Sequence, residues 1–400
     1  MLAAITAARQ GAEVTILEAG ERIGKKLLST GNGKCNLGNL FLSAECYYGG
    51  DKDFIAQALA HFDTMDTIRF FQGIGLLIKD KNGYLYPACE QAAVILDTLR
   101  FEIKSLGIKV CENCKVTKLH KTDKKLIVTA SENKYEFDSV ILACGGKAAP
   151  KTGSDGSGFA LAGTLGHHIV NVVPALVQLI CREDYLKAVA GVRTDAEITL
   201  ISEGRCIAKE RGELQLTDYG VSGIPVFQIS RVVNYLLLDK KTVQLQINLL
   251  PDLDEGEFHN LCLVRELLQQ NRNIEEFFTG MLHKKLMFLF IKLAGLKTEI
   301  PVEKAGKEKL KAVYDLCRSW RLTVSGSKTF EQAQVCAGGV DLTEITENME
   351  SKKIQGVYFA GEMMDVDGKC GGYNLQWAWT SGYLAGMGAA GTPVIKETNI

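Results

Sequence analysis

The sequence predicts an α/β protein with a discontinuous, Rossmann-type nucleotide-binding domain. Three short apolar stretches, at 14–18, 139–144 and 356–360, end in an acid or are followed by glycines, as parallel strands are where they meet a ligand. Between the last two of them, the sequence first alternates as β-strands do and then takes a helical period. We therefore expect a β module and a helical module inserted into the nucleotide-binding domain.

The composition predicts a globular protein whose partners are small molecules. The chain has 400 residues, of which 46% are hydrophobic and 23% charged, and this length allows two to three domains. A net charge of −1 provides no long-range field for a polyanion, so neither nucleic acid nor an acidic membrane is expected as a partner. No run of residues approaches the ~18 apolar positions that a membrane span needs.

Twelve cysteines are scattered through the apolar runs, which favours a reduced, cytoplasmic compartment over a disulfide scaffold. Cys111 and Cys114 have the spacing of a redox or zinc pair, but no second pair exists to complete a zinc site. We interpret them as two thiols on or beside a strand, and we predict no metal.

The N-terminal segment has the pattern of half a dinucleotide-binding unit. Residues 2–10 are small and apolar and precede Gly11, which predicts a helix that ends at a glycine. The buried strand 14–18 then ends in Glu18, an acid placed to accept hydrogen bonds from ribose hydroxyls. The first strand and the G-x-G-x-x-G turn of such a unit are missing and would lie just before Met1, so we expect a truncated chain or a misassigned start.

The element pattern sets the expected domain boundaries. Residues 1–178 and 334–400 would form the nucleotide-binding domain, 179–250 the inserted β domain and 251–333 the inserted helical subdomain. Only seven prolines and no low-complexity stretch argue against flexible linkers between them.

A glycine-rich stretch directly follows the strand that ends in Glu18. Its lysines, amides and backbone N–H groups are typical donors for a phosphate or for flavin carbonyls. It is not a Walker A loop, because Lys26 stands where Ser or Thr should follow, and the alternative is an ordinary surface turn. The candidate binding residues are Gly24, Lys25, Lys26, Ser29, Gly31, Asn32, Gly33, Lys34, Cys35 and Asn36.

A second candidate stretch follows the strand at 356–360 and leads into a helix of small residues. Acids after a strand are suited to ribitol hydroxyls, and a Gly-Gly turn that opens a helix aims backbone amides at an electron-rich atom such as N1 or O2 of a reduced flavin. Taken alone, the stretch could be a helix cap. The candidate residues are Gly361, Glu362, Asp367, Gly371, Gly372, Tyr373, Asn374 and Gln376.

These motifs, with those at 143–147, 152–157, 338–340 and 372–378, closely resemble the BaiN/YhiN-type FAD-dependent oxidoreductases over essentially the whole chain. The resemblance implies an FAD domain with an inserted β-barrel-like domain and a small helical subdomain. It also implies that Glu18 binds the adenosine ribose, that Val116 touches the adenine and that Gly145 contacts the cofactor. Residues 24–36 would line the diphosphate and flavin, and 361–376 would hold the ribitol and pyrimidine end.

The resemblance further implies an activity. FAD would be reduced by NAD(P)H and would pass hydride to an activated C=C bond, as in 3-oxo-Δ4 or Δ4,6 bile-acid intermediates. The alternatives are an FAD-dependent oxidase of small amines such as aminoacetone, and a non-catalytic flavin-binding protein. NAD(P)H would bind transiently, because the chain contains no second dinucleotide fingerprint.

Catalytic residues are not identified by the sequence. Asp218 stands where many relatives have His, and the candidate proton donors Tyr86, Tyr219 and Tyr373 are more typical of core or cap positions. The pair His167-His168 is interpreted as a solvated helix end. An apolar substrate would need an apolar wall, which the sequence offers in Met281, Leu282, Leu286, Met287, Phe288 and Phe290.

Overall fold

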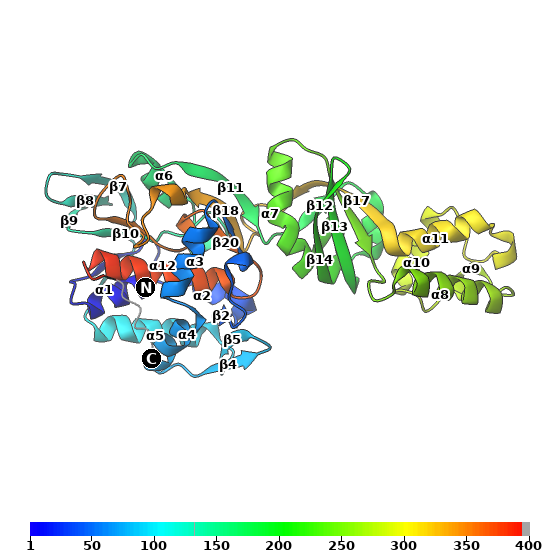
Figure 1. Cartoon of the computed structure of the whole chain (residues 1–400), viewed down its shortest axis with the longest axis horizontal. Coiled ribbons are helices and arrows are strands. Elements are labelled where there is room, and N and C mark those ends of the chain that lie inside the picture. The colour runs from blue at the N-terminus through cyan, green and yellow to red at the C-terminus, as the bar shows by residue number, and fades with distance from the viewer. Residues whose placement is uncertain (132, 394–400) are drawn as a thin grey trace. The chain divides into compact units, whose positions relative to one another are not determined.

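The computed structural model describes residues 1–131 and 133–393, which form two compact units (Figure 1). Unit 1 comprises residues 1–173 and the chain from Ala333 onward, and unit 2 comprises residues 174–332. A single cluster of buried side chains between Leu179 and Val324 forms the core of unit 2, and two further clusters lie in unit 1. Each unit therefore has a hydrophobic core of its own.

Unit 1 contains four short strands that pair in parallel as two two-stranded sheets. β1 pairs with β6 and β10 pairs with β19, so that Thr15 lies opposite Lys109 and Val140 opposite Val357. The strands predicted from the apolar stretches are confirmed at all three places. Their bounds are β1 Thr15–Leu17, β6 Lys109–Cys111, β10 Val140–Leu142 and β19 Val357–Phe359.

Smaller sheets complete unit 1. The antiparallel sets are β7-β8-β9, β2-β5-β4 and β20-β3, and β11 pairs with β18. Their bounds are β2 Gly38–Asn39, β3 Tyr47–Gly49, β4 Ile78–Lys81, β5 Tyr84–Pro87, β7 Val116–Lys121, β8 Leu126–Ala130, β9 Asn133–Phe137, β11 Ile169–Ala175, β18 Val335–Val340 and β20 Val366–Gly368.

The first and last helices of unit 1 pack side by side (Figure 1). A Cβ on Gly386 of α12 would lie 2.6 Å from the carbonyl oxygen of Ala3 on α1, so glycine permits this close approach. The predicted end of α1 is confirmed, because Gly11 has a φ of +89°. The helices are α1 Leu2–Arg9, α2 Lys25–Ser29, α3 Lys52–His61, α4 Thr64–Gly73, α5 Ala92–Ser105, α6 Ser157–Thr164 and α12 Tyr373–Ala389.

Unit 2 contains a closed six-stranded barrel in the order β12-β15-β14-β13-β16-β17. The β-barrel that the family resemblance implied is thus confirmed. Side chains alternate along β13, where Ala196, Ile198 and Leu200 are buried in the core. The strands are β12 Leu179–Cys181, β13 Arg193–Ser202, β14 Arg205–Leu216, β15 Gly220–Gly223, β16 Val243–Asn248 and β17 Trp320–Ser327.

The helices of unit 2 differ from the sequence expectation in one place. The segment from 180 to 250 favours strands, yet α7 lies within it, because Pro225 opens a helix after Gly223 and the buried Val226, Ile229 and Val233 repeat at helical spacing. The strand β17, in turn, follows the helices and closes the barrel. The helices are α7 Ile224–Leu238, α8 Glu255–Leu268, α9 Ile274–Phe278, α10 Lys284–Leu293 and α11 Lys307–Ser319.

The predicted apolar substrate wall is largely the core of unit 2. Leu286, Met287 and Phe290 on α10 are buried in that core, and the Phe290 ring meets Trp320 edge-on at 5.3 Å between centroids. Met281 and Leu282 pack against the same cluster. The expectation that this stretch faces a substrate is therefore wrong for these residues.

No helix in the described part of the chain is long and apolar enough to cross a bilayer.

Candidate functional site

The loops that follow β1, β10 and β19 meet at one lysine. Lys26 Nζ forms an ion pair of 2.6 Å with Glu362 Oε2 and donates a hydrogen bond of 3.2 Å to the Ala148 carbonyl. Lys26 follows β1, Ala148 follows β10 and Glu362 follows β19. The three carboxyl ends of the strands, where a nucleotide-binding sheet holds its ligand, are thus in contact through their loops.

Glu362 is held from two sides by the protein. Its Oε1 accepts a hydrogen bond of 2.8 Å from the Cys336 N–H, while Lys26 holds Oε2. A Cβ on Gly146 would lie 2.2 Å from Cys336 Sγ and 2.9 Å from Glu362 Cδ, so only glycine fits between these loops. Burial raises the pKa of the Cys336 thiol. Contact of Lys26 and Glu362 with a cofactor stays a prediction, since each charge is already paired.

Glu18 lies at the end of β1 and organises the loop after β6. Its Oε1 accepts a hydrogen bond of 2.7 Å from the Gly20 N–H. Its backbone N–H donates to the Cys111 carbonyl at 2.9 Å, and its carbonyl accepts from the Cys114 N–H at 2.7 Å. Because Val116 begins β7 two residues after Cys114, the structure brings both residues of the predicted adenosine site to the same loop.

The glycine turn before α12 forms a cradle around Asn36. Gly372 has a φ of +92°, and a Cβ there would lie 2.7 Å from Asn36 Oδ1 and 2.8 Å from the Gly38 carbonyl. Within the described residues, Asn36 Oδ1 is buried and has no hydrogen-bond partner. A buried acceptor without a donor costs about 1–3 kcal/mol, and a ligand N–H at this place would satisfy it. The cradle, the free acceptor and the strand ends fit the ring and ribitol of FAD.

The rest of the 24–36 stretch forms two short helical turns, α2 and the 3-10 turn Thr30–Gly33. Gly24 caps α2 with a φ of +83°, and Ser29 Oγ donates to the Lys26 carbonyl at 2.8 Å. Lys25 is exposed, Gly31 and Gly33 have positive φ, and burial raises the pKa of Cys35 to about 11. The side chain of Asn32 lies outside the described part of the structure.

Lys34 belongs to a cluster of cations around one carboxylate. Its Nζ lies 2.8 Å from Glu90 Oε2, and Lys79 and Lys81 contact the same group. Hydrogen bonds from the three lysines, Lys34 first, hold the pKa of Glu90 well below its usual range. The cluster has three positive charges and one negative charge.

Three predicted residues on α12 have partners in the protein. Asn374 exchanges two hydrogen bonds of 2.8 Å with the backbone of Gly368. Gln376 is fully buried and accepts a hydrogen bond of 3.0 Å from Thr67 Oγ1. The Tyr373 carbonyl accepts a hydrogen bond of 2.9 Å from the Tyr47 hydroxyl. These bonds fix the start of α12, and direct contact of the three with a cofactor stays a prediction.

The other candidates lie on the same loops. The Gly361 N–H donates to Ser381 Oγ at 2.9 Å, and Gly145 has a φ of +73° beside Ser154. Asp367 is buried on β20, and the Asn39 amide donates to the Gly371 carbonyl at 3.0 Å. Sequence reasoning missed Ala148 and Cys336, because their partners are distant in sequence and no local pattern marks them.

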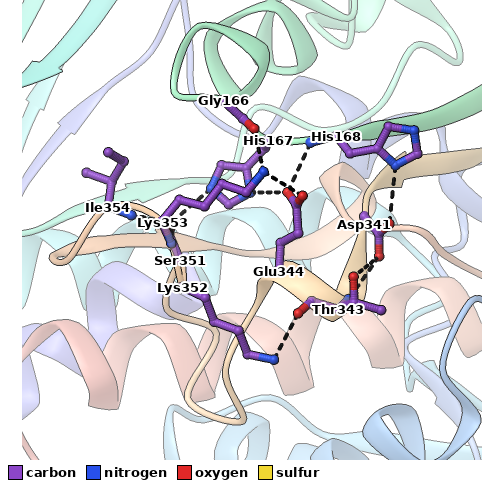
Figure 2. Close-up of polar contacts among 10 residues, drawn as sticks. All are labelled: Gly166, His167, His168, Asp341, Thr343, Glu344, Ser351, Lys352, Lys353 and Ile354. Atoms are coloured by element: carbon purple, nitrogen blue, oxygen red, sulfur yellow. Dashed lines mark hydrogen bonds and ion pairs between the residues drawn. The ribbon is translucent and has the colours of Figure 1, made fainter.

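A second polar cluster in unit 1 has the connectivity of a hydrolase triad (Figure 2). His167 Nδ1 lies 2.9 Å from Glu344 Oε2, and His167 Nε2 lies 2.8 Å from Ser351 Oγ. The interpretation of His167 as a solvated helix end is wrong, because Gly166, with a φ of +86°, turns the ring inward onto Phe359. His168 alone is exposed, with Nδ1 3.2 Å from Asp341.

The geometry of this cluster indicates a structural role. Burial lowers the pKa of His167, so the neutral ring donates from Nδ1 to the carboxylate and accepts from the Ser351 hydroxyl. Ser351 Oγ also accepts hydrogen bonds of 3.1 and 2.9 Å from the N–H groups of Lys353 and Ile354. Ser351 is buried and fully bonded, so it is not a nucleophile but an anchor for the loop after β18.

The chain matches a known family over nearly its whole length. Residues 1–388 match the family described as HI0933-like protein Rossmann domain. The chain belongs to this family. The resemblance to BaiN/YhiN-type proteins is thereby confirmed, and the HI0933-like chain has the Rossmann-type domain expected of it.

Two relatives of this chain have the names of enzymes. The chain is 40% identical over 396 residues to the 3-dehydro-bile acid delta(4,6)-reductase of Clostridium scindens, covering 98% of this chain and 97% of the relative. It is 30% identical over 389 residues to the ribosomal RNA dihydrouridine synthase of Haemophilus influenzae, covering 95% and 93%.

The fold of the HI0933-like chain is also similar to a solved structure. The 3-ketosteroid delta1-dehydrogenase of Sterolibacterium denitrificans matches with a TM-score of 0.50 at 10% identity, covering 98% of this chain and 97% of that one. This likeness concerns the fold. Within residues 1–131 and 133–393, no group of His, Cys, Asp and Glu side chains is arranged to hold a metal ion.

Proposed function

We propose that this protein is an FAD-dependent oxidoreductase that reduces a C=C bond conjugated with a carbonyl. The observation that carries the proposal is the buried Asn36 oxygen in the glycine cradle at the start of α12, which has no hydrogen-bond partner among the described residues. The name of the 40% identical relative supports a reduction and suggests 3-oxo-Δ4,6 bile-acid intermediates as substrates.

The proposal assigns FAD to residues 1–178 and 334–400. Glu18 and the Val116 backbone would hold the adenosine, residues 24–36 and Gly145 the diphosphate and flavin, and residues 361–376 the ribitol and pyrimidine. When bound, FAD supplies two-electron chemistry, with a hydride taken from NAD(P)H and a hydride given to the β carbon of the substrate.

The residues of this chain contribute electrostatics at the start of α12. The helix has 17 residues, and its N-terminal N–H groups and positive dipole end favour negative charge nearby. Lys26 neutralises Glu362, so the carboxylate does not oppose such a charge. Solvent would supply the proton that the substrate α carbon needs to complete the reduction.

Anaerobic half-reactions test the proposal. The purified protein should show a flavin absorbance band that NADH or NADPH bleaches, and a 3-oxo-Δ4,6 steroid acid should restore it with a product two mass units heavier. An amine oxidase would instead be reduced by aminoacetone and reoxidised by oxygen. A protein whose bound flavin reacts with none of these would contradict the proposal.

A second candidate substrate follows from the relative named as a ribosomal RNA dihydrouridine synthase. The C5=C6 bond of uridine is also conjugated with a carbonyl, so the same chemistry would reduce it. The net charge of −1 provides little attraction for RNA, which places this candidate second. Incubation of ribosomal RNA with the protein and NADPH, followed by mass analysis of the nucleosides, decides between the two substrates.

A further inference from the structure

Three large, exposed side chains gather at one end of the β2-β5-β4 sheet in unit 1. Phe41 is 70% exposed, Leu40 43% and Tyr84 40%. The Leu40 N–H donates to the Gly83 carbonyl at 2.8 Å, which joins the end of β2 to the start of β5. The Phe41 ring lies directly on Gly83, where a Cβ would be 2.4 Å from its Cε2 atom. We call Leu40, Phe41 and Tyr84 the apolar platform.

The platform borders the glycine turn that opens α12. A Cβ on Gly371 would lie 3.0 Å from Cε1 of Tyr84. The Phe41 carbonyl accepts a hydrogen bond of 3.4 Å from the Tyr373 hydroxyl. Asn39 directly precedes the platform, and its side-chain amide donates to the Gly371 carbonyl. The platform is therefore continuous with the cradle at Asn36 and Gly372.

The backbone of the platform is fixed although its side chains are exposed. The Phe41 N–H donates to Asn39 Oδ1 at 2.9 Å, and its carbonyl is held by Tyr373. A pre-ordered aromatic surface loses little conformational entropy when a ligand covers it. Exposed apolar patches of this kind on a polar surface are typical of binding sites.

Cations lie on the same face of this sheet as Tyr84. Lys81 is directly opposite Tyr84 and Lys79 is opposite Tyr86, and side chains of opposed residues point to the same face. Lys79, Lys81 and Lys34 share the single carboxylate of Glu90, so the cluster retains an excess of two positive charges.

We infer that the platform binds the flat apolar body of the substrate and that the lysine cluster attracts an anionic tail on it. This inference rests on the proposed function, and it narrows the substrate class to apolar ring systems that carry a carboxylate. A neutral steroid would use the platform alone. A small enone without an apolar body would use neither feature.

Equilibrium dialysis of the FAD-loaded protein with two saturated, non-reducible probes tests this inference. The probes are 3-oxocholanoic acid, which carries a carboxylate, and androstane-3,17-dione, which is neutral. Phe41→Ala should weaken the binding of both by about threefold to tenfold, because one face of a ring is lost. Lys81→Gln should weaken the binding of the acid alone, and added salt should reduce that difference.

Phe101→Ala is the matched control, because Phe101 is 71% exposed on α5 of the same unit. It should leave the binding of both probes unchanged. Equal binding of the probes by wild type and Phe41→Ala would overturn the inference that the platform binds the substrate. Loss of flavin or of thermal stability in Phe41→Ala, but not in Phe101→Ala, would overturn it too. Failure of the wild type to bind either probe would also overturn it.

The probes cannot be reduced, so the test does not depend on turnover. Probe binding that needs Phe41, in a protein that reduces no enone, would contradict the proposed function and leave the platform in place. Reduction of small and large enones with equal KM, without an effect of Phe41→Ala, would support the proposed function and overturn the platform.

Discussion

Two polar side chains with buried atoms in unit 1 differ in whether the protein supplies hydrogen-bond partners for those atoms. Both ring nitrogens of His167 have partners, Glu344 and Ser351. Asn36 Oδ1 is buried and has no such partner in the part of the chain that the structure describes. A satisfied buried group stabilises the fold, whereas an unsatisfied acceptor destabilises it until a donor arrives. At the scale of single residues, this difference separates an anchor from a binding group.

Replacement of His167 by Asn should destabilise the protein by about 1–3 kcal/mol, because Glu344 and Ser351 lose a buried partner. Burial lowers the pKa of His167 in the folded state, so the unfolded chain binds its proton more readily. The stability is therefore full above the ordinary histidine pKa of about 6.5 and is lost as pH falls toward the folded pKa. Urea unfolding at several pH values should show this loss in the wild type and not in His167→Asn.

Glu18 should matter for the cofactor more than for the fold. If its carboxylate binds ribose hydroxyls, Glu18→Ala should weaken FAD binding by about 1.5–3 kcal/mol for each charged bond lost. Glu18→Gln can keep the bond from the Gly20 N–H, so it separates the loss of charge from the loss of the turn. Fluorescence titration of the apoprotein with FAD measures both variants, and unchanged affinity in Glu18→Ala would exclude the ribose role.

At the scale of elements, local patterns were enough to predict α1, β1, β10 and β19. Each depends on a short run of apolar residues and a glycine or acid at its end, which are signals that the neighbouring sequence supplies. α7 was not predicted, because its apolar residues lie in a segment that also alternates. The barrel strand β17 falls inside the predicted helical module at 251–333, because it directly follows the last helix of that module, α11.

The contacts of the candidate site could be predicted less well than its loops. The two glycine-rich stretches come into contact, because Gly372 lies against Asn36, and their contact with a cofactor stays a prediction. The partners of Lys26, Asn374 and Gln376 could not be predicted, because hydrogen bonds between residues far apart in sequence leave no local pattern. Those partners depend on how the elements pack, which only the structure shows.

The ion pair between Lys26 and Glu362 should stabilise the junction of α2 with the loop after β19. Both side chains are largely buried, so we expect a coupling free energy of about 1–2 kcal/mol, between the values for surface and buried pairs. A double-mutant cycle with Lys26→Ala and Glu362→Ala, followed by urea unfolding, measures it. Additive effects of the two substitutions would show that the pair contributes no energy of its own.

At the scale of the whole molecule, the two units differ in how the chain supplies them. Unit 2 is one continuous segment, residues 174–332, and its core includes both barrel strands and helices. Unit 1 is assembled from two segments, one that precedes unit 2 in the sequence and one that follows it. A unit that consists of one continuous segment and contains its own hydrophobic core can fold independently.

The excised segment 174–332 should therefore fold by itself. We expect a cooperative thermal transition, because the barrel is closed within the segment and its core side chains are all present. Phe290→Ala should lower the midpoint of this transition, since the ring is fully buried against Trp320. A non-cooperative transition of the excised segment would show that unit 1 contributes to its stability.

The assembly of unit 1 from two distant segments of the chain has a consequence for synthesis on the ribosome. Lys26 is made 336 residues before Glu362, and at about 5–20 residues per second it waits roughly 17 to 67 seconds for its partner. All strands of the unit 2 barrel are synthesised before α12. Unit 2, which follows the first segment of unit 1 in the sequence, can therefore form its internal contacts before unit 1 can. During that interval α1 and the nascent strands of unit 1 must be shielded from aggregation by something other than the helix that finally covers them.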